Sequence, residues 1–100
     1  MAAIPFPIRV KPGRKLIELG ARGCTDAEIL AILLGSGGRG YSALDAATAL
    51  IERYGTLGAL MGRGLDEVAS VRGIKAVRAI RLAAAYELCQ RVLAETARDA

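Results

Sequence analysis

The stretch that decides the fold is Val68-Ala69-Ser70-Val71-Arg72-Gly73-Ile74-Lys75-Ala76-Val77-Arg78-Ala79-Ile80. Its pattern predicts a helix, a tight turn and a second helix. A sharp turn that leads into a helix gathers unpaired backbone N–H groups, which suit a phosphate group. Arg78 and Arg81 follow on the first turns of the second helix. The stretch therefore predicts a helix-hairpin-helix that holds a nucleic-acid backbone.

The turn departs in one place from the usual helix-hairpin-helix pattern of glycine, aliphatic residue and glycine. Gly73 and Ile74 fill the first two places, and Lys75 fills the third. A lysine contacts phosphate through its ammonium group, but its side chain hinders a close approach to the backbone. We predict that Arg72, Gly73, Ile74, Lys75, Arg78 and Arg81 bind DNA phosphates. The alternative is a hairpin turn without a ligand, in which Ile74 only plugs the core.

A second candidate contact follows from the loop Gly35-Ser36-Gly37-Gly38-Arg39-Gly40. It matches the dinucleotide-binding pattern G-x-G-x-x-G, but that fingerprint needs a preceding strand, and here a helix is expected. We interpret the loop as a second hairpin whose Gly37, Gly38, Arg39 and Ser42 face a helix N-terminus and contact phosphate. A turn without a ligand is again the alternative.

The rest of the chain predicts an all-α fold of about six short helices arranged as two hairpins. Ala and Leu dominate the composition and favour helix, and strand-favouring residues never gather into an alternating run. Thr25 and Glu28 form a capping box, and Ser42 and Thr56 are the caps of later helices. We expect an extended segment at 1–12, a helical domain at 13–96 and frayed residues at 97–100. The helices are expected near 13–19, 25–34, 43–54, 57–61, 65–71 and 75–94.

Composition excludes several function classes. The 100 residues include no histidine, and Cys24 and Cys89 belong to no metal-binding pattern, so we expect no catalytic residue, metal or cofactor. The net charge is +4, and four basic residues without an acid lie between Arg72 and Arg81. The longest apolar run, Ile29 to Leu34, is far shorter than the ~20 residues of a membrane span. We therefore expect a cytoplasmic protein whose partner is DNA.

The chain resembles the N-terminal domain of the bacterial RadC-type (UPF0758) family, whose members carry a DNA-repair designation. The resemblance rests on residues 11–20, 50–55 and 71–75 and most specifically on TDAEILAILLGSG at residues 25–37. It implies a helical, helix-hairpin-helix-like domain. It also implies a C-terminal domain of the JAB/MPN metalloprotease type, with a zinc motif of two histidines and an aspartate. That motif is not in this sequence, so no metal or hydrolase chemistry transfers to it.

Two functions follow as expectations. The first is a sequence-independent DNA-binding module that contacts phosphates through the hairpin backbone and basic side chains. The second is a protein-interaction or dimerisation module that positions the metalloprotease-like domain, which this chain lacks. The second is favoured by a hydrophobic content of 53%, which exceeds what one small core needs.

Overall fold

The computed structural model describes residues 11–35 and 41–99, and these residues are helical with no strand. The all-α prediction is confirmed. The elements are α1 (Pro12–Leu19), the 3-10 helix η1 (Ala21–Gly23), α2 (Asp26–Leu34), α3 (Ala43–Tyr54), α4 (Leu57–Leu60), α5 (Leu65–Ala69) and α6 (Ala76–Asp99).

Several helix ends differ from the sequence prediction, and α5, which was expected to reach residue 71, ends at Ala69. α1 begins at Pro12. The N–H of the first helical residue has no acceptor within the helix, so a proline there loses no hydrogen bond, and the fixed φ of proline suits a helix. α6 extends to Asp99 instead of ending near Ala94. Residues 94–98 are mostly good helix formers, and the Thr96 hydroxyl donates to the carbonyl of Val92 at 3.0 Å without interrupting the helix.

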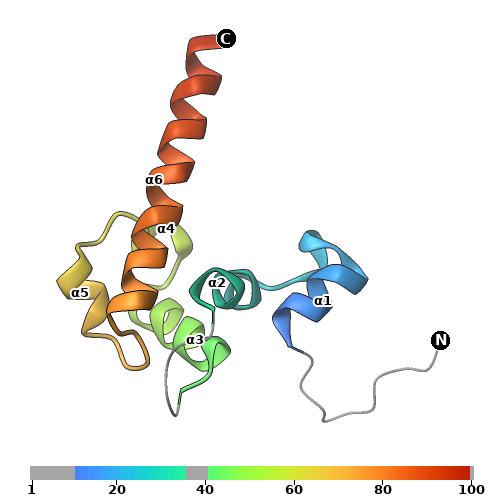
Figure 1. Ribbon diagram of the computed structural model, residues 1–100, viewed down its shortest axis with the longest axis vertical. Coiled ribbons are helices and arrows are strands. Elements are labelled where there is room, and N and C mark those ends of the chain that lie inside the picture. Colours follow the sequence, from blue (N-terminus) through green and yellow to red (C-terminus); the bar gives the residue numbers. More distant parts are fainter. Residues whose placement is uncertain (1–10, 36–40, 100) are drawn as a thin grey trace.

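The core lies where α2, α3, α4, α5 and α6 meet. Leu34, Leu50 and Leu60 are completely buried, and α2 packs chiefly on α3 and α6. Figure 1 shows α1 on the opposite side of α2 from α5 and α6, and none of the α1 residues is buried. None of the helices in the described residues is long and apolar enough to cross a membrane.

The helix starts follow the local signals in the sequence. Ser42 and Thr56 each accept a hydrogen bond from the backbone N–H three residues on, as expected for caps. At α2 the capping box is complete: Thr25 N–H donates to Glu28 Oε1 at 2.7 Å, and Glu28 N–H donates to Thr25 Oγ1 at 3.2 Å. Lys15 of α1 also donates to the Glu28 carboxylate at 2.9 Å, which ties α1 to the start of α2.

The Glu28 contacts predict a pH dependence of stability. The N–H of Thr25 and then the ammonium of Lys15 hold the pKa of Glu28 below its ordinary value. A lowered folded-state pKa gives stability that is complete above the unfolded pKa and is lost as pH falls through the folded one. Glu28→Gln keeps an acceptor for the Thr25 N–H but loses the charge that Lys15 and the helix dipole favour, so it should lower the unfolding free energy by about 0.5 kcal/mol at pH 7. Its difference from wild type should shrink below about pH 4.

Urea unfolding measured across pH checks this expectation. The control is Glu52→Gln on the exposed surface of α3, which should change stability little at any pH. A difference between wild type and Glu28→Gln that stays constant from pH 7 to pH 3 contradicts the assigned role.

Candidate nucleic-acid interface

The turn between α5 and α6 lies where the sequence predicts a hairpin, and its geometry is consistent with that prediction. Gly73 has φ +87°, in the left-handed region that favours glycine. Ile74 is only 2% exposed and belongs to the core cluster. Its N–H donates to the carbonyl of Val71 at 3.0 Å. Ile74 therefore plugs the space between the helices, as predicted, and its N–H is already used within the turn.

Gly73 is also required by a close contact with Tyr41, the residue two positions before α3. A Cβ atom at Gly73 would lie 2.5 Å from Tyr41 Cδ1 and 3.1 Å from the Cβ of Ala46. The guanidinium of Arg72 covers the Tyr41 ring, with Cζ 5.1 Å from the ring centroid. The α5–α6 hairpin thus rests on the segment that enters α3. The close approach that glycine permits is occupied by a protein side chain.

Arg78 is buried beneath this contact, with only 2% of the residue exposed. Its Nε donates to the carbonyl of Gly35 at 3.1 Å, and its Nη1 donates to the carbonyls of Tyr41 and Gly73, both at 3.0 Å. The sequence pattern predicts Arg78 at a phosphate. In the structure its guanidinium faces the protein interior, because a buried arginine needs acceptors and three carbonyls supply them.

Arg81 reaches the same end of α2. Its Nη1 donates to the carbonyl of Leu34 at 2.7 Å, although the residue is exposed overall. The carbonyls of Leu34 and Gly35 lie at the C-terminal end of α2, where the helix dipole is negative and carbonyls lack helical donors. Arg78 and Arg81 therefore stabilise the end of α2, a contact that no local sequence pattern signals.

The remaining candidates divide into exposed residues and residues outside the described ranges. Arg72, Lys75 and Ser42 are exposed, and the Ser42 hydroxyl accepts from the N–H of Asp45 at 3.0 Å. The predicted contacts at Gly37, Gly38 and Arg39 lie outside the described residues. The structure therefore brings the α5–α6 turn next to Tyr41 and leaves Arg72 and Lys75 as its exposed cations.

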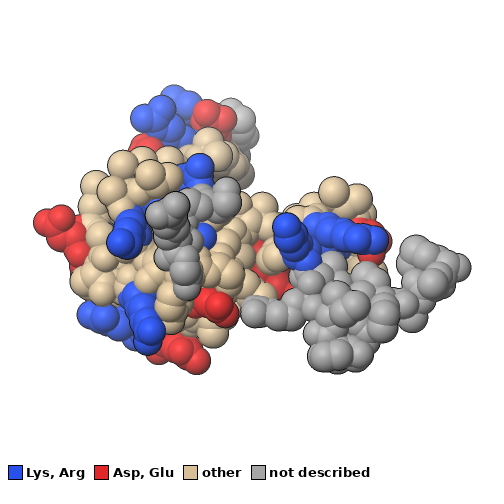
Figure 2. All heavy atoms as spheres, turned by 60° about the horizontal axis from the view of Figure 1, so that its bottom comes forward, with Lys and Arg blue, Asp and Glu red and all other residues tan. Residues whose placement is uncertain are grey.

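On the face that Figure 2 shows, the charge distribution limits the area over which an anionic partner could bind. Lys and Arg side chains there form separate groups, with Asp and Glu close to several of them. Among the described residues drawn in that view, no broad basic surface covers the face. An anionic partner bound here contacts a few cations only.

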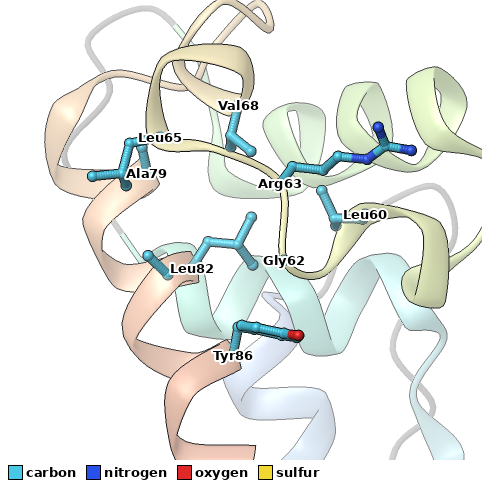
Figure 3. A pocket seen from close by; sticks show the side chains of 9 residues that line it. Leu60, Gly62, Arg63, Leu65, Val68, Ala79, Leu82 and Tyr86 are labelled. Atoms are coloured by element: carbon cyan, nitrogen blue, oxygen red, sulfur yellow. The ribbon is translucent and has the colours of Figure 1, made fainter. Parts of the chain in front are cut away.

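A pocket of about 100 Å³ opens on another side of α6. In Figure 3, Leu82 and Tyr86 of α6 lie across it from Leu60 and Val68. The lining is mainly apolar, and the Arg63 Nε donates to the carbonyl of Ala59. Within residues 11–35 and 41–99 no group of three or more Cys, Asp or Glu residues is placed to hold a metal ion. The pocket offers space for an apolar group.

The Gly73 contact leads to a stability prediction. Gly73→Ala should destabilise the fold by about 3 kcal/mol, because the left-handed conformation becomes strained and the new methyl group meets Tyr41. Gly55→Ala is the matched control, since Gly55 also has φ +87° but a methyl group added there would meet no neighbouring atom within 4 Å. The control should lose only about 1 kcal/mol in chemical denaturation. Equal losses would show that the Tyr41 contact is unimportant.

Arg78 leads to a second stability prediction. Arg78→Leu leaves three carbonyls without their donor and should lower the unfolding free energy by about 3 kcal/mol or more. Arg81→Leu should cost less than half as much, because water can reach the carbonyl partner of that exposed residue. Thermal and urea unfolding measure both variants. A stable Arg78→Leu variant contradicts the internal role of this guanidinium.

Comparison with known proteins identifies the family. A family model described as UPF0758 N-terminal matches residues 5–80. The chain is 41% identical over 98 residues to a UPF0758 protein of Cupriavidus taiwanensis, covering 98% of this chain and 43% of that protein. It is 38% identical over 95 residues to one of Neisseria meningitidis serogroup B, covering 95% and 42%. No solved structure matches the chain.

The chain spans less than half the length of these relatives, and the matched domain is their N-terminal one. The identity extends over nearly the whole sequence, so the similarity is not confined to the hairpin. The chain belongs to the UPF0758 family, of which it carries the N-terminal domain.

Proposed function

We propose that this domain binds the backbone of DNA weakly and without reading its sequence, through the α5–α6 turn. The observation that carries the proposal is the placement of Arg72 and Lys75. They are the charged side chains of residues 68–77, and both are exposed. A duplex or a single strand that lies across the turn meets two cations and no acid from this segment.

Arg72 is prepared for phosphate by its contact with Tyr41. A guanidinium stacked on an aromatic ring loses less freedom when it forms hydrogen bonds, because its plane is already oriented. Its N–H groups suit two oxygens of a phosphate. Tyr41 supports the arginine here instead of stacking on a base, since Arg72 lies over its ring.

Lys75 stands at the start of α6. Its carbonyl accepts from the N–H of Ala79 at 2.9 Å, which makes it the residue that caps the helix. The positive end of a 24-residue helix and the lysine ammonium act on the same region of solvent. Both favour an anion there, with no need for base-specific contacts.

The proposed contact is small. Ile74 and Arg78 are buried, and Gly73 is in contact with Tyr41, so none of these three can reach a phosphate. The cations of the turn that can do so are the exposed Arg72 and Lys75. We include in the proposal a second contact formed by Gly37, Gly38, Arg39 and Ser42. Ser42 follows Tyr41 in the chain, and Tyr41 contacts the turn at Gly73. With few phosphates neutralised, the affinity is low and falls with salt in proportion to their number.

A second candidate function is a protein-interaction module. Leu88, Val92 and Leu93 are 64%, 53% and 63% exposed on the distal part of α6. Large apolar side chains that gather on one exposed helix indicate a surface that another polypeptide covers. The greater length of the relatives is consistent with a positioning role for this helix.

DNA binding is tested by Arg72→Gln combined with Lys75→Gln. The double variant should reduce the slope of log affinity against log salt by about 2, one unit for each phosphate contact. Affinity for a duplex and a single strand of mixed sequence is measured by fluorescence anisotropy at low salt. The control is Lys11→Gln with Arg22→Gln, which removes the same charge from exposed residues beside α1 and α2.

The control variant should bind almost as wild type does. Equal losses in the two double variants would show that net charge, and not the turn, governs binding. An unchanged affinity in Arg72→Gln with Lys75→Gln overturns the proposal.

A further inference from the structure

The side chain of Tyr41 is held against the α5–α6 turn by two neighbours. Its ring lies so close to Gly73 that a Cβ atom added there would be 2.5 Å from Tyr41 Cδ1. The guanidinium of Arg72 lies over the ring, with Cζ 5.1 Å from the ring centroid. The carbonyl of Tyr41 also accepts from the buried Arg78 at 3.0 Å. The backbone and the ring of Tyr41 are therefore both fixed, and they support Arg72 from one side.

The other side of the Arg72 guanidinium is open to solvent. Arg72 is exposed, and none of the ion pairs within residues 11–35 and 41–99 involves it. A guanidinium is planar, so it offers a flat outer face as well as an edge of N–H donors. The contact with Tyr41 uses neither the outer face nor the donors, and both remain available to a ligand.

An exposed arginine plane supported by an aromatic ring suits a nucleobase. Proteins that bind unpaired strands stack bases on guanidinium planes and aromatic rings. Stacking uses the face of the guanidinium, whereas hydrogen bonds to phosphate use its edge, so one arginine serves the base and the backbone of the same strand. In a duplex the neighbouring base pairs cover the faces of each base. Only an unpaired base therefore fits on Arg72.

Charge alone favours a duplex over a single strand, because the duplex releases more counterions for each phosphate that is neutralised. This advantage is small here. Arg72 and Lys75 are the exposed cations of the turn, and Figure 2 shows no broad basic surface among the described residues. One stacked base raises affinity by about 10-fold, and every base has a face that stacks. Stacking therefore outweighs the charge advantage of the duplex.

We propose that the α5–α6 turn prefers single-stranded DNA, with one unpaired base stacked on the outer face of Arg72 and the adjoining phosphates beside Arg72 and Lys75. The inference rests on the proposed backbone binding and names its ligand class. Tyr41 is a positioning residue in this contact. It fixes the plane of the guanidinium before the base arrives, so less freedom is lost on binding.

Three ligands separate stacking from charge: a single strand of mixed sequence, an abasic strand of the same length and a duplex. The abasic strand carries the same phosphates without bases. In fluorescence anisotropy at low salt, wild type should bind the single strand about 10-fold more tightly than the abasic strand, and more tightly than the duplex. The ratio of the two strand affinities should persist as salt is raised, because both strands lose the same phosphate contacts.

Two single variants assign the effect to one residue. Arg72→Lys keeps the charge but removes the planar group, so the ratio of the single-strand to the abasic-strand affinity should fall to about one. The matched control is Lys75→Gln, which removes a phosphate contact and should weaken both strands alike with the ratio unchanged. Both positions are exposed, and circular dichroism verifies that the two variants stay helical.

The inference is overturned by a wild type that binds the abasic strand or the duplex as tightly as the single strand. An Arg72→Lys variant that keeps the wild-type ratio overturns it as well. Backbone binding is judged separately by the affinity for the abasic strand. If that affinity falls in Arg72→Gln combined with Lys75→Gln, the proposed function stands without a stacked base. If wild type binds none of the three ligands, the inference and the proposed function both fail.

Discussion

The fold depends on one buried guanidinium. Arg78 joins the end of α2, the entry to α3 and the α5–α6 turn by donating to carbonyls of all three. Without Arg78, three carbonyls would lose this donor at the place where the three chain segments meet: those of Gly35, Tyr41 and Gly73. Because the cost of burying an arginine is offset only by well-placed acceptors, these segments must keep one relative position. The glycine at position 73 and the ring at position 41 are consequences of the same close packing.

The burial of Arg78 leaves fewer positive charges of the hairpin available to a partner than the sequence suggests. Four basic residues between positions 72 and 81 look alike in the sequence, but the structure assigns them different tasks. Arg78 is internal, and Arg81 donates to the end of α2 while remaining exposed. Arg72 and Lys75 remain at the surface, and any binding of a nucleic-acid backbone at this turn depends mainly on them. A low affinity with a modest salt dependence is the physical consequence.

The long helix α6 links two parts of the molecule with different surroundings. Its first half closes the core, and its second half offers an apolar face to solvent. The family model ends at residue 80, whereas the helix continues to Asp99 without a break. The segment beyond the matched domain is thus rigidly attached to it. A surface on that segment is presented in a fixed direction from the hairpins, which suits either pairing of two copies or the positioning of another domain.

The sequence by itself determined the helical class, most helix boundaries, the three caps and the plug at Ile74. These features depend on interactions within a few residues: a hydroxyl and an N–H three positions on, a glycine after a helix, or apolar residues three and four apart. Only the tertiary structure decided which arginines face solvent. The carbonyl partners of Arg78 include two that are 43 and 37 residues away, and no local pattern encodes such distances. The sequence analysis also placed the end of α6 too early. The helix continues to Asp99 although residues 87–98 are exposed, so its last turns depend on the helix propensity of the chain and not on packing against the core.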